Sequence, residues 1–202
     1  MKTFKKIACS VLALGLVMGL TACAPKTFEH QKLIDFLEDQ DFDDSKELED
    51  YYYDYSDIIT YGRTDDDGAY VHCEGKDAQE VYDRITNRFG NYPDYDVEEA
   101  TTFCFRDGKG FAQGYLLSFE DIKDAEKFLK KYGKALPDDY EDGDEKSYSY
   151  YIYSGESSGD KETNIGVYLR GNTVLIMISV GVDADLTEDF CKAFGVKSPT
   201  EL

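Results

Sequence analysis

The run Val174-Leu175-Ile176-Met177-Ile178, introduced by Thr173, is apolar at every position. Successive side chains of a β-strand point to opposite faces of the sheet, so this run presents apolar side chains to both faces. Such a strand is stable only where other parts of the chain cover it on both sides. The sequence therefore predicts a central strand in a sheet that is covered on both faces.

Two glycine-containing connections between apolar segments predict β-hairpins. Gly171-Asn172 separates the central run from Ile165–Leu169, and Arg106–Gly110 separates Thr101–Phe105 from Phe111–Phe119. Connections this short join antiparallel strands. We therefore expect a largely antiparallel sheet, which excludes the doubly wound parallel sheet of nucleotide-binding folds.

An internal repeat predicts three helices. The segments Ile85–Gly90, Phe128–Gly133 and Phe190–Gly195 each place two large apolar residues four positions apart and end in glycine. Residues four apart share a helix face, and glycine favours the left-handed conformation that caps a helix C-terminus. Each segment follows an apolar strand, and two acids three positions apart mark each expected start: Asp77 with Glu80, Asp121 with Asp124, and Asp185 with Glu188.

Apolar spacing within Phe28–Phe42 predicts one more helix near the N-terminus. The sequence thus predicts an α+β fold, with a largely antiparallel sheet, repeated strand-helix units and an N-terminal helix. Residues 28–202 are long enough to bury one core, and we expect them to form a single acidic domain.

Residues 1–22 have the three parts of an export signal. Lys2, Lys5 and Lys6 precede an uncharged core from Ile7 to Leu20, and small residues follow. That core is shorter than the roughly 20 residues of a membrane-spanning helix, so cleavage is expected rather than a permanent span.

The end of this signal, Leu20-Thr21-Ala22-Cys23, resembles the lipobox of bacterial lipoproteins. The resemblance implies cleavage before Cys23, a covalent lipid on its thiol, residues 23–27 as a lipidated tether, and a protein anchored on the extracytoplasmic face of the cell membrane. Two acyl chains are enough for stable anchoring. The alternative is an ordinary secretory signal in which Cys23 is an unmodified thiol.

With its lipobox, its strand-helix repeats and the stretch Tyr168–Val174, the chain is also similar to small Gram-positive surface lipoproteins of unknown function. This likeness implies a place at the cell surface and brings no catalytic or binding residues.

The charge of the chain limits its partners. It holds 42 acidic and 22 basic residues, for a net charge of −20. This charge repels the phosphates of nucleic acids, which we exclude as partners. Cations and basic partners are attracted, although surplus surface carboxylates also serve solubility alone.

Motifs for catalysis are missing from the sequence. It contains no serine-hydrolase, zinc-protease, P-loop or dinucleotide-binding motif, so we expect no enzymatic activity and no cofactor other than the lipid. His30 is expected on a surface helix. His72 is expected on a strand beside Cys73, with the two side chains on opposite faces. A Cys–His pair with Cys104 or Cys191 stays geometrically open.

Three cysteines remain once Cys9 leaves with the signal and Cys23 carries the lipid. One disulfide among Cys73, Cys104 and Cys191 has three alternative pairings, and buried free thiols are the other interpretation.

The segment Arg63–Glu74 approximates a twelve-residue calcium loop. Asp65 and Asp67 take its third and fifth places, Gly68 its sixth and Glu74 its twelfth. Arg63 stands where the first ligand belongs, which argues against calcium. The alternative is a solvated Asp-Gly turn that leads into a strand.

Tyrosines are concentrated in two places and could supply a binding face, because each ring is apolar and ends in a polar hydroxyl. Tyr51, Tyr53, Tyr150 and Tyr151 are the candidates; the alternative is that they cover a sheet. The favoured function is a non-catalytic binding module at the cell surface that contacts an extracytoplasmic protein, peptide or glycan. The rival is an extracytoplasmic enzyme or calcium-dependent binder that uses the acidic loops.

Overall fold

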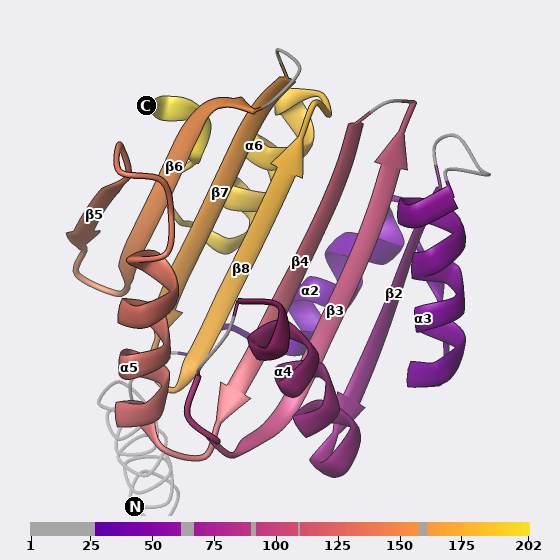
Figure 1. Ribbon diagram of the computed structural model, residues 1–202, viewed down its shortest axis with the longest axis horizontal. Helices are drawn as coiled ribbons and strands as arrows, with labels where there is room; N and C mark the ends of the chain where they lie inside the picture. Colours follow the sequence, from indigo (N-terminus) through magenta and orange to yellow (C-terminus); the bar gives the residue numbers. More distant parts are fainter. Residues whose placement is uncertain (1–26, 62–66, 90–91, 109, 158–160) are drawn as a thin grey trace, which may run out of the picture.

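The computed structural model describes residues 27–202 apart from 62–66, 90–91, 109 and 158–160 (Figure 1). Eight strands form one sheet in the order β1-β2-β3-β4-β8-β7-β6-β5, and every neighbouring pair except β1 and β2 is antiparallel. The strands are β1 (Asp43–Asp44), β2 (Asp67–Glu74), β3 (Val97–Asp107), β4 (Gly110–Phe119), β5 (Glu141–Asp144), β6 (Ser149–Ser157), β7 (Lys161–Arg170) and β8 (Thr173–Val180). The predicted α+β fold with a largely antiparallel sheet is confirmed.

Helices cover both faces of this sheet (Figure 1). They are α2 (His30–Asp39), α3 (Leu48–Tyr55), α4 (Gly75–Phe89), α5 (Ile122–Gly133) and α6 (Ala184–Phe194); a π-helical segment (Ser56–Tyr61) continues α3, and a short 3-10 helix (Pro199–Glu201) ends the chain. The buried apolar side chains form two hydrophobic cores, one on each face of the sheet. The first core contains side chains of α3, α4 and α5, and the second core contains side chains of α2 and α6. Within the described ranges, no helix is long and apolar enough to cross a membrane.

The apolar run that opened the sequence is strand β8, and it lies in the middle of the sheet between β4 and β7. Val174 and Ile176 belong to the first core, while Leu175 and Met177 belong to the second. The predicted central strand, covered on both faces, is confirmed.

Both predicted hairpins are present. Strands β3 and β4 pair from Asp107↔Gly110 outward, and β7 pairs with β8 from Arg170↔Thr173. Gly171 in the second turn has φ of 62°, a left-handed conformation that glycine adopts without steric cost.

The expected helix ends are correct in part. Gly195 caps α6 in the left-handed conformation, as predicted, and Asp121 caps the start of α5. Gly133, however, is the last helical residue of α5, and the prediction of a left-handed cap there is wrong. A Cβ on Gly133 would clash with the ring of Tyr151, so this glycine allows close packing of α5 on β6. Gly90 lies outside the described residues.

Candidate functional site

The two histidines of the chain come together with a glutamate on the face of the sheet that α2 covers. On that face, His72 of β2 lies opposite Thr101 of β3, and Glu99 lies opposite Ser118 of β4. His30 is the first residue of α2 and packs onto these four side chains, with its ring centroid 5.4 Å from that of His72. We call His30, His72 and Glu99 the His–His–Glu cluster.

One hydroxyl joins the two rings of the cluster. Thr101 Oγ1 lies 2.8 Å from His30 Nδ1 and 2.9 Å from His72 Nδ1. The opposite ring nitrogens lie near the carboxylate of Glu99: His30 Nε2 is 3.6 Å from Oε2, and His72 Nε2 is 3.5 Å from Oε1. His30 Nε2 also lies 2.9 Å from Ser118 Oγ.

Burial keeps His30 neutral. Loss of solvent, with a smaller contribution from His72, lowers the pKa of His30 to about 3. Burial also raises the pKa of the Glu99 carboxyl above its ordinary value. At neutral pH the His30 ring is therefore uncharged and carries a nitrogen lone pair.

The expectation that His30 lies on a surface helix is wrong, because only 7% of this residue is exposed. His30, Leu33 and Leu37 are the buried residues of α2, spaced at three and four positions along one helix stripe. The sequence could have indicated a buried His30, because the apolar stripe of the helix extends back to this position. The pairing with Glu99 had no comparable signal, since it depends on the register of β2 against β3.

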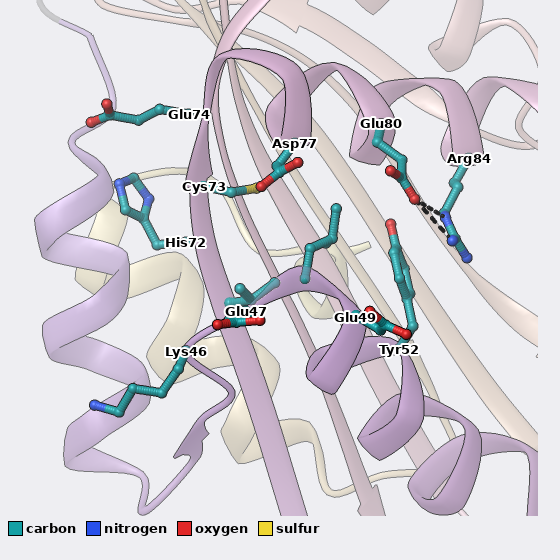
Figure 2. A pocket seen from close by; sticks show the side chains of 12 residues that line it. Lys46, Glu47, Glu49, Tyr52, His72, Cys73, Glu74, Asp77, Glu80 and Arg84 are labelled. Atoms are coloured by element: carbon teal, nitrogen blue, oxygen red, sulfur yellow. Dashed lines mark hydrogen bonds and ion pairs between the residues drawn. The ribbon is translucent and has the colours of Figure 1, made fainter.

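A groove lies beside the cluster, where β2 meets the starts of α3 and α4 (Figure 2). Its volume is about 740 Å³. Its lining is Lys46, Glu47, Leu48, Glu49, Tyr52, Val71, His72, Cys73, Glu74, Asp77, Glu80 and Arg84, and we call it the acidic groove. In Figure 2, Glu47 and Glu49 lie on the α3 side of the cavity and Asp77 and Glu80 on the α4 side.

Both bases of the acidic groove are engaged with acids. Lys46 Nζ lies 3.2 Å from Asp44, and Arg84 lies 2.9 Å from Glu80 and stacks on the ring of Tyr52 at 3.5 Å. The groove therefore has a net negative charge that favours a cationic ligand.

The acidic groove runs along an open strand edge. Strand β1 pairs with β2 only at Ala69 and Tyr70, and the amide of Ser45 donates to the Tyr70 carbonyl. Lys46 then adopts a φ of 41° and the chain turns away into α3. Among the described strands, β3 alone pairs with β2 beyond this point. The Tyr70 carbonyl points away from β3, toward β1, and the backbone groups of every second residue of a strand point to the same edge. The N–H and C=O of His72 therefore face the groove.

A smaller cavity of about 370 Å³ lies next to the groove, between α3 and α4. Tyr52 and Arg84 line both cavities. The smaller cavity is also lined by Tyr51, Tyr55 and Tyr115. Its wall is therefore aromatic, with hydroxyl groups at the ring ends.

The residues proposed for calcium do not meet. Asp67 and Glu74 are the first and last residues of β2, and a strand rises about 3.3 Å per residue, which separates them by roughly 23 Å. The calcium-loop interpretation fails for this pair because the segment folds as a strand. Asp65 lies outside the described residues, as does Cys23.

The four candidate tyrosines do not form one face. Tyr51 is buried in the first core, and Tyr53, on the same helix, is 68% exposed. Tyr150 and Tyr151 are neighbours on β6 and point to opposite cores. Of the four, Tyr51 alone lines a cavity described above.

The cysteines offer little thiolate chemistry. Cys73, Cys104 and Cys191 are free thiols, so none of the three possible disulfides forms. Burial raises the pKa of Cys73 and Cys104 to about 12 and that of Cys191 to about 11. All three stay protonated at neutral pH, and a protonated thiol is a poor nucleophile.

No protein-family model matches the chain, and searches of curated proteins and of solved structures give no significant match. The fold and the site define an α+β protein with an eight-stranded sheet, a partly buried His–His–Glu cluster and an acidic groove at one sheet edge.

Proposed function

We propose that this chain is a lipid-anchored, non-catalytic binding module on the extracytoplasmic face of the cell membrane, and that the acidic groove takes an extended basic peptide segment of a partner protein. The observation that carries the proposal is the coincidence of an open strand edge with a groove lined by five acids. An extended peptide can add to such an edge through main-chain hydrogen bonds, while its alternate side chains enter neighbouring pockets.

The charge of the groove selects the partner. Lysine or arginine side chains of an added strand would point toward Glu47, Glu49 and Asp77. An acidic peptide would be repelled by the same side chains, and by the net charge of −20 of the whole chain.

Two peptides of opposite charge test the groove. We expect an alternating Lys–Val octapeptide to bind the full-length protein in detergent, and its Glu–Val counterpart not to bind, as measured by fluorescence anisotropy. Glu49→Gln with Asp77→Asn should weaken binding by up to about thirtyfold, because each of the two exposed charges contributes up to about 1 kcal/mol. Higher salt should weaken it further.

The matched control is Glu126→Gln with Asp139→Asn, which removes two exposed acids away from the groove. Equal losses of peptide affinity in the two double variants would show that binding depends on the total charge of the protein. That result would overturn the acidic groove as the binding site. N-methylation of alternate peptide bonds removes backbone donors and should also abolish binding. An N-methylated peptide that binds as well as the parent would overturn strand addition.

The membrane anchor has its own test. In cells fed an alkyne-labelled palmitate, the full-length chain should take up label and sediment with membranes, because two acyl chains hold a protein there stably. Cys23→Ala should lose both properties. Label on Cys23→Ala, or a wild-type chain without label, would contradict the lipid anchor.

A further inference from the structure

We infer that His30, His72 and Glu99 bind a borderline divalent metal ion of the zinc class, through Nε2 of each imidazole and the carboxylate of Glu99. One ligand atom from each residue lies within 4.8 Å of those of the other two. Two ligand atoms each about 2.0–2.1 Å from a tetrahedral zinc ion lie roughly 3.3–3.4 Å apart. Each Nε2 lies close to that distance from one oxygen of the Glu99 carboxylate, 3.6 Å from Oε2 for His30 and 3.5 Å from Oε1 for His72.

The hydroxyl of Thr101 orients both rings for this role. A threonine oxygen has two acceptor lone pairs, and here each lies within hydrogen-bond distance of one Nδ1. When both rings donate from Nδ1, both Nε2 atoms carry lone pairs directed toward the Glu99 side. Metal-binding histidines usually donate their other ring nitrogen to such an oxygen, which fixes the tautomer.

The charge of the cluster favours a cation. The carboxylate of Glu99 and the Nε2 atoms of both histidines lie close together, where they can donate electron pairs to one cation. Ions can enter past His72 and Glu99, whose side chains are 30% and 35% exposed.

The donor set identifies the class of ion. Two imidazole nitrogens with one carboxylate oxygen suit Zn²⁺ and its neighbours Co²⁺ and Ni²⁺, whereas Ca²⁺ and Mg²⁺ prefer sites made of oxygen alone. Cys73 does not take part, because it lies on the opposite face of β2 from His72.

In the metal-free cluster, the Ser118 hydroxyl lies 2.9 Å from His30 Nε2 and can donate to it. A metal ion would replace this hydrogen bond. Ser118 therefore separates the two interpretations of the cluster: a metal site does not need its hydroxyl, and a purely structural network does.

The test uses the full-length protein in detergent, stripped with a chelator and held in excess Ca²⁺ and Mg²⁺ to occupy surface acids. We expect one Zn²⁺ to bind per chain by calorimetry. At about a hundredfold over its dissociation constant, the ion should raise the melting temperature by several degrees. In ¹⁵N NMR spectra of the zinc form, both imidazoles should carry their proton on Nδ1.

Variants assign the ion to this cluster. His72→Ala and Glu99→Gln change the two partly exposed ligands and should weaken zinc binding more than tenfold; Thr101→Val should weaken it roughly 10- to 100-fold by releasing the rings. Ser118→Ala should bind zinc within about twofold of the wild type. Glu98→Gln removes the neighbouring exposed acid of β3 and is the charge control.

No thermal shift with Zn²⁺ in the wild type overturns the inference, since the cluster would then be held by hydrogen bonds alone. Equal zinc binding by the wild type, His72→Ala and Glu99→Gln also overturns it, because the ion would lie elsewhere. The zinc test is independent of the peptide test, so either proposal can fail without the other.

Discussion

In chelator, the protein is expected to lose stability of the order of 4 kcal/mol as the pH falls from about 6.5 to about 3, because of His30. Burial lowers the pKa of this ring in the folded state to about 3, from its ordinary value of 6.5. Between these values the unfolded chain binds a proton that the folded chain excludes. Acid therefore favours unfolding in this range. Above about pH 6.5 neither state binds this proton, so the ionisation of His30 no longer lowers the stability of the folded protein.

The measurement is urea denaturation at several pH values, with His30→Gln as the comparison. Glutamine keeps a polar side chain beside Thr101 and Ser118 but does not titrate. His72 and Glu99, which face the ring, are present in both proteins, so the difference between the two stability curves reports the loss of the His30 ring. Curves that stay parallel from pH 6.5 to pH 3 would refute this role.

Local patterns were sufficient to predict much of the fold. The doubly apolar run of β8 indicates a strand with both faces covered, and the short connection at Gly171-Asn172 indicates its hairpin. Both are properties of a few adjacent residues, which is why they can be read without the tertiary structure. The order of the strands is different, because β4 and β8 pair across more than fifty residues and no local pattern specifies that partner.

The candidate site depends on such distant pairings. His72 and Glu99 approach each other because β2 and β3 pair in one particular register, and a one-residue slip would send His72 to the other face. The helical stripe of His30, Leu33 and Leu37 could have placed His30 inward, yet it carries no information on what His30 would meet. The calcium-loop prediction failed for the same reason. The spacing along the chain matches a calcium loop, but the segment folds as an extended strand, which holds Asp67 and Glu74 far apart.

Phe128→Ala is expected to lower the free energy of unfolding by about 3–5 kcal/mol, the range for removing a fully buried phenylalanine. Phe128 is fully buried on α5. Its ring centroid lies 5.3 Å from Phe119 of β4, 5.7 Å from Tyr82 of α4 and 5.7 Å from Tyr132, one turn along its own helix. Truncation would leave a cavity where two helices and the sheet meet.

Urea denaturation followed by far-ultraviolet circular dichroism measures the loss, and the midpoint should fall by more than about 1 M. Phe128→Leu keeps most of the volume and should cost clearly less. A similar loss in both variants would show that the ring geometry matters more than the cavity.

The same substitution tests whether the sheet unfolds as a unit. The core that contains Phe128 also contains Val71 of β2 and Val167 of β7, from the two halves of the sheet. If this shared core couples the halves, Phe128→Ala should shift one cooperative transition without splitting it. Two transitions would instead mean that the half with the His–His–Glu cluster and the acidic groove folds independently of α5. Both sites would then survive damage to the other half, whereas in a single unit the Phe128→Ala change lowers the urea concentration at which both are lost.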